Sequence, residues 1–108
     1  MNLLTKQGVW LAEINDYFLW LIQCLDDVWS RWGNTPVITS GADGKHMEGS
    51  YHYINKAWDV RVWGLRNPQS EADQLREKLN EDGNEWRVLY GDKYHQDHMH
   101  VEVHVKGE

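Results

Sequence analysis

The stretch HMHVEVHV, residues 98–105, has the clearest secondary-structure pattern in the chain. Apolar and polar residues alternate along it, the apolar ones being Met99, Val101, Val103 and Val105. Because successive side chains of a β-strand point to opposite faces, this alternation predicts a strand with one face in the core. The opposite face then carries His98, His100, Glu102 and His104. The fold is therefore expected to contain a sheet whose last strand presents histidines on its outer face.

Earlier segments predict two helices and three more strands. Apolar residues recur at three- and four-residue steps over about residues 9–32, which predicts one long amphipathic helix ended by Gly33. A second helix is expected from Asn67-Pro68 to Gly83, because proline suits the first helical position and glycine the C-terminal end. Short β-prone runs at 37–39, 57–63 and 86–90 predict strands. In the run at 57–63, Asp59 and Arg61 share a face.

This order of elements predicts an α+β domain, with a small antiparallel or mixed sheet and helices packed on one side. A chain of 108 residues supports one hydrophobic core, so residues 1–108 are expected to form a single domain. Its long helix covers about 9–32 and its functional core about 37–105. We expect a monomer.

Composition excludes several classes of function. The net charge of −6 disfavours binding to a nucleic-acid backbone, and the longest apolar run is far below the roughly 20 residues of a membrane span. Neither a signal-peptide core nor a cleavage site is recognisable at the N-terminus, so synthesis in the cytoplasm is expected.

The single cysteine, Cys24, lies in an apolar stretch and is expected to be a buried, inert thiol. The seven tryptophans should mostly fill the core, with Trp58 or Trp63 as candidates to line a groove.

Two segments, SYHYINKAWD at 50–59 and HQDHMH at 95–100, have the residue types and spacing of a metal site. His52 and Asp59 stand seven residues apart, and either histidine of the downstream His-x-His pair can add a third ligand. Three protein ligands with an open position are typical of catalytic zinc, whose bound water becomes acidic enough for amide or ester hydrolysis. His46 is either a group at the edge of the site or a solvated loop residue. We interpret His104 as a surface residue, and Glu102 as either a solvated or a strand-pairing residue.

The first segment resembles the SxHxxGxAxD motif of the zinc D-Ala-D-Ala peptidases, and residues 97–101 resemble their HxH strand. That family includes carboxypeptidases, murein endopeptidases, phage endolysins and the hedgehog signalling domain. The resemblance spans about residues 37–105. It implies a hedgehog-like or D,D-peptidase-like fold, and zinc ligation by His52, Asp59 and His100.

The same resemblance implies roles for the neighbouring residues. Ser50 would contact the metal ligands without binding the metal itself, and His98 would be the non-ligating histidine beside the metal-bound water. The general base stays open among His98, His95 and Asp97, because the glutamate that many relatives carry before the HxH strand is absent. Arg61 follows the ligand Asp59 on the same strand face, where it would either anchor a substrate carboxylate or form a structural ion pair.

The function implied is zinc-dependent hydrolysis of peptide bonds in bacterial peptidoglycan, by a peptidase of the D,D- or L,D-type. Ser40-Gly41 is not followed by the arginine with which carboxypeptidase relatives bind a terminal carboxylate, which favours an endopeptidase. Such a short chain resembles a phage lysin, acting on the cell wall after release or as a component of the virion. The alternative is a zinc-containing binding or structural module without hydrolysis, as the hedgehog domain illustrates.

Overall fold

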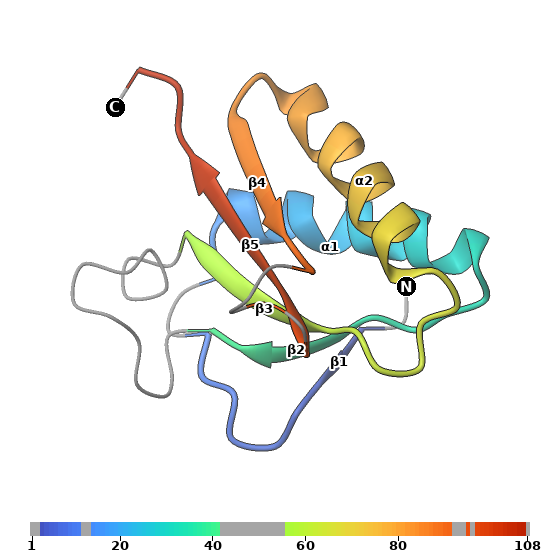
Figure 1. The fold of residues 1–108 in the computed structure, drawn as a ribbon. Coiled ribbons are helices and arrows are strands. Elements are labelled where there is room, and N and C mark those ends of the chain that lie inside the picture. Colours follow the sequence, from blue (N-terminus) through green and yellow to red (C-terminus); the bar gives the residue numbers. More distant parts are fainter. Residues whose placement is uncertain (1–2, 12–13, 42–55, 92–94, 96, 108) are drawn as a thin grey trace.

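Two α-helices and five strands succeed one another in the computed structural model, which describes residues 3–11, 14–41, 56–91, 95 and 97–107 (Figure 1). The elements, in chain order, are β1 (Leu4–Thr5), α1 (Asp16–Arg31), β2 (Val37–Ser40), β3 (Ala57–Arg61), α2 (Pro68–Leu79), the 3-10 turn η2 (Asn80–Asp82), β4 (Glu85–Leu89) and β5 (His98–His104). The predicted α+β class is confirmed.

The strands form one mixed sheet in the order β1-β2-β3-β5-β4. β1 runs parallel to β2, and the other neighbouring pairs are antiparallel. β5, the last strand in the chain, therefore lies between β3 and β4 near the centre of the sheet (Figure 1). This position pairs the histidine-rich strand directly with the strand that carries Asp59.

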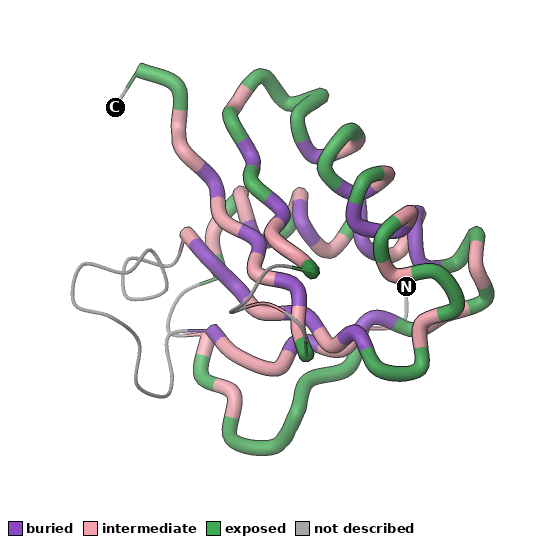
Figure 2. Tube along the Cα trace, viewed as in Figure 1, coloured by how far each residue is buried: buried purple, intermediate pink, exposed green. Residues whose placement is uncertain are grey.

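One face of the sheet is buried under both helices. Figure 2 shows the expected alternation of buried and intermediate residues along β5. The buried strand residues join those of α1 and α2 in one hydrophobic cluster, whose sheet side includes Trp58, Val60, Trp86, Val88, Met99, Val101 and Val103. Because both helices contribute to this single cluster, they cover the same face, and no helix of the described residues lies on the other face of the sheet.

Tryptophans contribute much of this core. Trp29, Trp58 and Trp86 are almost fully buried, and the Trp58 ring lies 6.3 Å from that of Trp86 and 5.6 Å from that of Phe18. Trp58 is thus a core residue and does not line a groove. Trp63, by contrast, is 68% exposed.

The first helix begins at Asp16, and the expectation that it starts near residue 9 is wrong. The Asn15 side chain accepts a hydrogen bond from the Phe18 backbone N–H at 2.9 Å, which satisfies a donor that has no partner inside the helix. Residues with helical apolar spacing precede Asn15, but this cap sets the boundary. Val9 and Leu11 instead pack against the core from outside any helix.

The remaining elements agree with the expected pattern, with small shifts at their ends. Pro68 opens α2, and Gly83 follows η2 with a φ of 88°, a conformation that glycine adopts without strain. β1 was not expected from the sequence, because a two-residue strand has too few residues to show alternation. Among the described residues, no helix is long and apolar enough to cross a membrane.

Candidate metal centre

The face of the sheet opposite α1 and α2 brings together the polar residues of β3 and β5. In the antiparallel register, Asp59 is the partner of His100 and Arg61 is the partner of His98. Each pair sits on the face opposite the core, since the flanking residues Trp58, Val60, Met99 and Val101 are buried. The register therefore confirms that Asp59, Arg61, His98 and His100 share one surface.

Asp59 is the carboxylate on which the two histidines of the HxH pair converge. Its Oδ1 lies 3.1 Å from His100 Nδ1 and 3.8 Å from His98 Nε2. The side chains of Asp59 and His100 are 13% and 14% exposed, so this pair is largely shielded from water. Strand alternation predicted that His98 and His100 share a face, and the structure confirms this. Their approach to Asp59 comes from the pairing of β3 with β5.

His95 completes a cluster of three imidazoles. Its ring centroid lies 5.4 Å from that of His98 and 5.6 Å from that of His100. A hydrogen bond from the Gly91 N–H to the His95 carbonyl oxygen, 2.7 Å long, holds His95 beside the end of β4. His95 thus lies near both the end of β4 and the first residues of β5.

Asp97 reaches the cluster through His98. Its carboxylate Oδ1 lies 2.8 Å from His98 Nδ1, and its side chain is 91% exposed. Because a carboxylate can only accept, Nδ1 carries the proton and Nε2 faces Asp59. β5 begins at His98, so Asp97 precedes the regular strand and both residues contribute on this side of the sheet. The pKa of Asp97 is lowered by the hydrogen bond and the charge of His98.

Glu102 belongs to the cluster, so of the two alternatives expected for it, a solvated residue is wrong, and a strand-pairing residue omits its contacts with two histidines. Its Oε1 lies 2.8 Å from His100 Nε2, its Oε2 contacts His104 Nε2, and its side chain is 17% exposed. Alternation along β5 already placed these three residues on one face. What it did not reveal is that two-residue spacing lets one carboxylate contact the histidine on each side.

Both ring nitrogens of His100 face carboxylates, which favours its protonated form when no metal is bound. Burial alone lowers the pKa of His100, but the hydrogen bonds and charges of Asp59 and Glu102 outweigh burial and raise it above its ordinary value. Burial likewise raises the pKa of Glu102, and hydrogen bonds from His104 and His100 outweigh that effect and lower it. The site is therefore a compact set of opposite charges.

Asp59 and His100 fit the requirements of a divalent metal. Two ligands held 2.0–2.2 Å from a tetrahedral zinc ion stand roughly 3.3–3.6 Å apart, slightly more than the 3.1 Å between Asp59 Oδ1 and His100 Nδ1 in their hydrogen-bond contact. Within the described ranges no group of three or more His, Cys, Asp or Glu residues is placed to hold a metal. The expected third ligand, His52, lies outside those ranges, as do Ser50 and His46.

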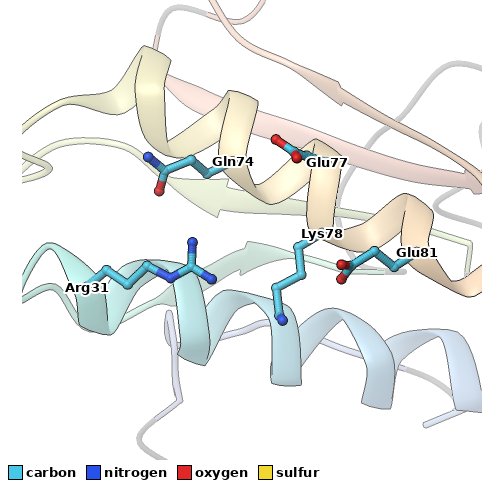
Figure 3. A pocket seen from close by; sticks show the side chains of 5 residues that line it. All are labelled: Arg31, Gln74, Glu77, Lys78 and Glu81. Atoms are coloured by element: carbon cyan, nitrogen blue, oxygen red, sulfur yellow. The ribbon is translucent and has the colours of Figure 1, made fainter.

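A hollow on the helix side of the molecule is distant from these residues in the fold. Figure 3 shows it between α1 and α2, lined by Arg31, Gln74, Glu77, Lys78 and Glu81. It encloses about 140 Å³, and Lys78 Nζ is already paired with Asp27 at 3.2 Å. This hollow lies across the core from the histidines, so we assign it no part in the site.

The sequence matches no protein-family model and no curated protein significantly.

Proposed function

We propose that this chain is a zinc-dependent peptidase that hydrolyses peptide bonds in bacterial peptidoglycan, as an endopeptidase of the phage-lysin type with a hedgehog-like or D,D-peptidase-like fold. The observation that carries the proposal is the convergence of His98 and His100 on Asp59 across two neighbouring strands. It is supported by the motif at 50–59, whose last residue is that same aspartate. Local sequence and long-range pairing thus point to one group.

Some residues of the site would be metal ligands, and others would transfer protons. Asp59 and His100, with His52, would hold the ion, which when bound polarises the scissile carbonyl and acidifies water. Glu102 orients His100 through Nε2, an outer contact typical of metal-binding histidines. His100 must lose the Nδ1 proton before it can ligate, so metal binding releases protons.

His98 is the residue best situated to move a proton during the reaction. Asp97 holds its Nδ1–H, which leaves Nε2 as the nitrogen directed towards Asp59 and the reacting groups. A carboxylate behind an imidazole selects its tautomer and orients the other ring nitrogen for general acid–base catalysis. Asp97 then acts as a positioning residue for His98. His95 borders both histidines and is the second candidate for proton transfer.

The test combines a clearing assay on purified peptidoglycan with measurement of bound zinc. Wild-type protein should clear the substrate, and a chelator should abolish clearing until zinc is restored. His52→Ala and Asp59→Asn should lose metal and activity together, whereas His98→Ala should lose turnover with zinc still bound. Asp73→Asn changes a carboxylate on the exposed side of α2 and should keep both properties.

Each other result has a defined meaning. Zinc binding without clearing by the wild-type protein would overturn the peptidase and favour the non-catalytic zinc module. Activity of His98→Ala equal to that of the wild type would overturn the assignment of the proton carrier. The protein can also be purified without a His-tag and dialysed against zinc. If it still contains no metal, both the zinc peptidase and the non-catalytic zinc module are contradicted.

A further inference from the structure

Arg61 stands beside the candidate metal centre with hydrogen-bonding capacity that the described structure does not use. It is the register partner of His98 and lies two residues after Asp59 on the same strand face. Side chains two apart on a strand are separated by about 6.6–7 Å. Arg61 thus lies one step from the carboxylate on which the histidines converge.

The guanidinium has no hydrogen-bond acceptor in the part of the chain that the structure describes. Its Nε is buried and makes no hydrogen bond there, and Arg61 forms no ion pair with a carboxylate of the same part. This is unusual in a chain with 17 acidic and 11 basic residues, where carboxylates are abundant. Nη1 and Nη2 also make no hydrogen bond to the described residues and are not buried, so they are the N–H groups that a ligand can reach, whereas the buried Nε is closed to it.

Trp63 holds this guanidinium in position. Arg61 Cζ lies 3.8 Å from the centroid of the Trp63 ring, a stacked cation–π contact. The ring remains 68% exposed, which is costly for so large an apolar surface. Stacking restricts the arginine side chain without using its N–H groups, so those of Nη1 and Nη2 stay available for a carboxylate.

A groove adjoins the Arg61–Trp63 pair where β3 ends and β2 begins. Its walls come from residues 33–35 and Val37 on one side, and from Arg61, Trp63, Gly64 and Leu65 on the other. It encloses about 240 Å³, less than the roughly 300–1,000 Å³ of pockets for drug-sized ligands. This is room for a group the size of an amino acid, with apolar surface on Trp63 and Leu65 and a positive charge at Arg61.

We infer that Arg61 and Trp63 form a subsite for a free carboxylate of the peptide substrate, one or two residues away from the bond cleaved at the metal centre. The distance follows from the strand spacing, because an extended peptide advances about 3.3–3.6 Å per residue. The assignment as a substrate subsite rests on the proposed function. The carboxylate belongs either to the end of the peptide or to an acidic side chain.

The experiment measures binding without turnover, on zinc-depleted protein, so that failure of hydrolysis does not affect it. Three probes are titrated: an acetylated alanine tripeptide with a free C-terminus, the same peptide amidated, and an amidated peptide with one glutamate. The indole N–H signal of Trp63, assigned with Trp63→Phe, reports occupancy by NMR. The variant is Arg61→Gln, and Arg87→Gln is the matched control. Arg87 is on edge strand β4, 50% exposed, and lies 3.6 Å from Glu85.

Binding of a carboxylate-bearing probe, with a shift of the Trp63 signal, is the expected result. Arg61→Gln should weaken it roughly tenfold to a hundredfold, as loss of a charged hydrogen bond does, while Arg87→Gln should not. Preference for the first or third probe identifies a terminal or a side-chain carboxylate. Equal binding of the neutral peptide, equal loss in both variants, or no binding of any probe would overturn the subsite. If the protein binds a probe in this way but does not clear peptidoglycan, only the proposed hydrolysis is overturned and the subsite stands.

Discussion

Glu102 accepts hydrogen bonds from His100 and His104, so it is one contact removed from Asp59. If His100 is a metal ligand, the charge of Glu102 orients its ring and raises the basicity of the ligating nitrogen. Replacing Glu102 with glutamine removes that charge. We expect Glu102→Gln to weaken zinc binding about 10–100-fold, the usual loss for such outer contacts. Competition against a chromophoric chelator measures this. Glu85→Gln, on the exposed edge strand, should bind zinc as the wild type does, and unchanged affinity in Glu102→Gln would contradict the role.

Cys24 presents a second expectation for a single residue. It is fully buried, and burial is the largest of the causes that raise the pKa of its thiol to about 12. The thiolate is the reactive form, so almost none is present near neutral pH. Folded protein at pH 8 should therefore resist iodoacetamide, and protein unfolded in urea should be alkylated, as mass spectrometry can show. Rapid labelling of the folded chain would contradict the buried environment.

Among the structural elements, α1 depends on Asn15 for its beginning. The Asn15 side chain caps Phe18, and Leu21, Cys24, Leu25 and Val28 follow on the buried face of the helix. Asn15→Ala should lower the free energy of unfolding by about 0.5–2 kcal/mol, whereas Asn15→Ser should retain most of it because serine also caps. Urea denaturation gives both values. Equal stability of Asn15→Ala and the wild type would show that the cap does not set the start of the helix.

The pairing of α1 with α2 predicts a dependence of stability on pH. Asp27 of α1 pairs with Lys78 of α2, whose hydrogen bond is the largest cause that lowers the pKa of Asp27. A lowered pKa means that the stabilisation is present above the unfolded value, about 3.9, and is lost as pH falls through the folded value. Because Asp27 is 44% exposed, the effect should stay below about 1 kcal/mol.

Asp27→Asn tests that dependence directly. The variant should be less stable than the wild type at pH 7 in low salt, and the difference should disappear towards pH 2–3, where Asp27 of the wild type becomes protonated. Urea unfolding at the two pH values gives the comparison. A difference that persists in acid would mean that the substitution acts through packing and not through charge.

For the whole molecule, bound zinc should contribute to stability. A ligand that binds only the folded state at 100 times its Kd adds about 2.7 kcal/mol, so zinc should raise the melting temperature and a chelator should reverse the rise. Asp59→Asn should melt at the same temperature with and without the ion. If zinc leaves the wild-type melting temperature unchanged, the cluster around Asp59 is not a metal centre under those conditions.

The predictions that held depend on local patterns. Alternation in residues 98–105 was enough to place Met99, Val101 and Val103 in the core, because a strand has only two faces. The same rule placed Asp59 with Arg61, and His98 with His100, on common faces. Pro68 and Gly83 marked the second helix because their backbone preferences are intrinsic to the residues.

Only the tertiary structure decided which of these faces meet. The antiparallel register of β3 and β5 sets Asp59 against His100, although 41 positions separate them, and hydrogen bonds between distant strands leave no trace in local periodicity. The same folding joined Glu102 to two histidines and left Arg61 stacked on Trp63 without an acceptor in the described chain. By itself, the sequence determined which residues can do chemistry and which side of each strand they occupy. Their mutual contacts come from the pairing of strands, because that pairing is fixed by the packing of the whole core.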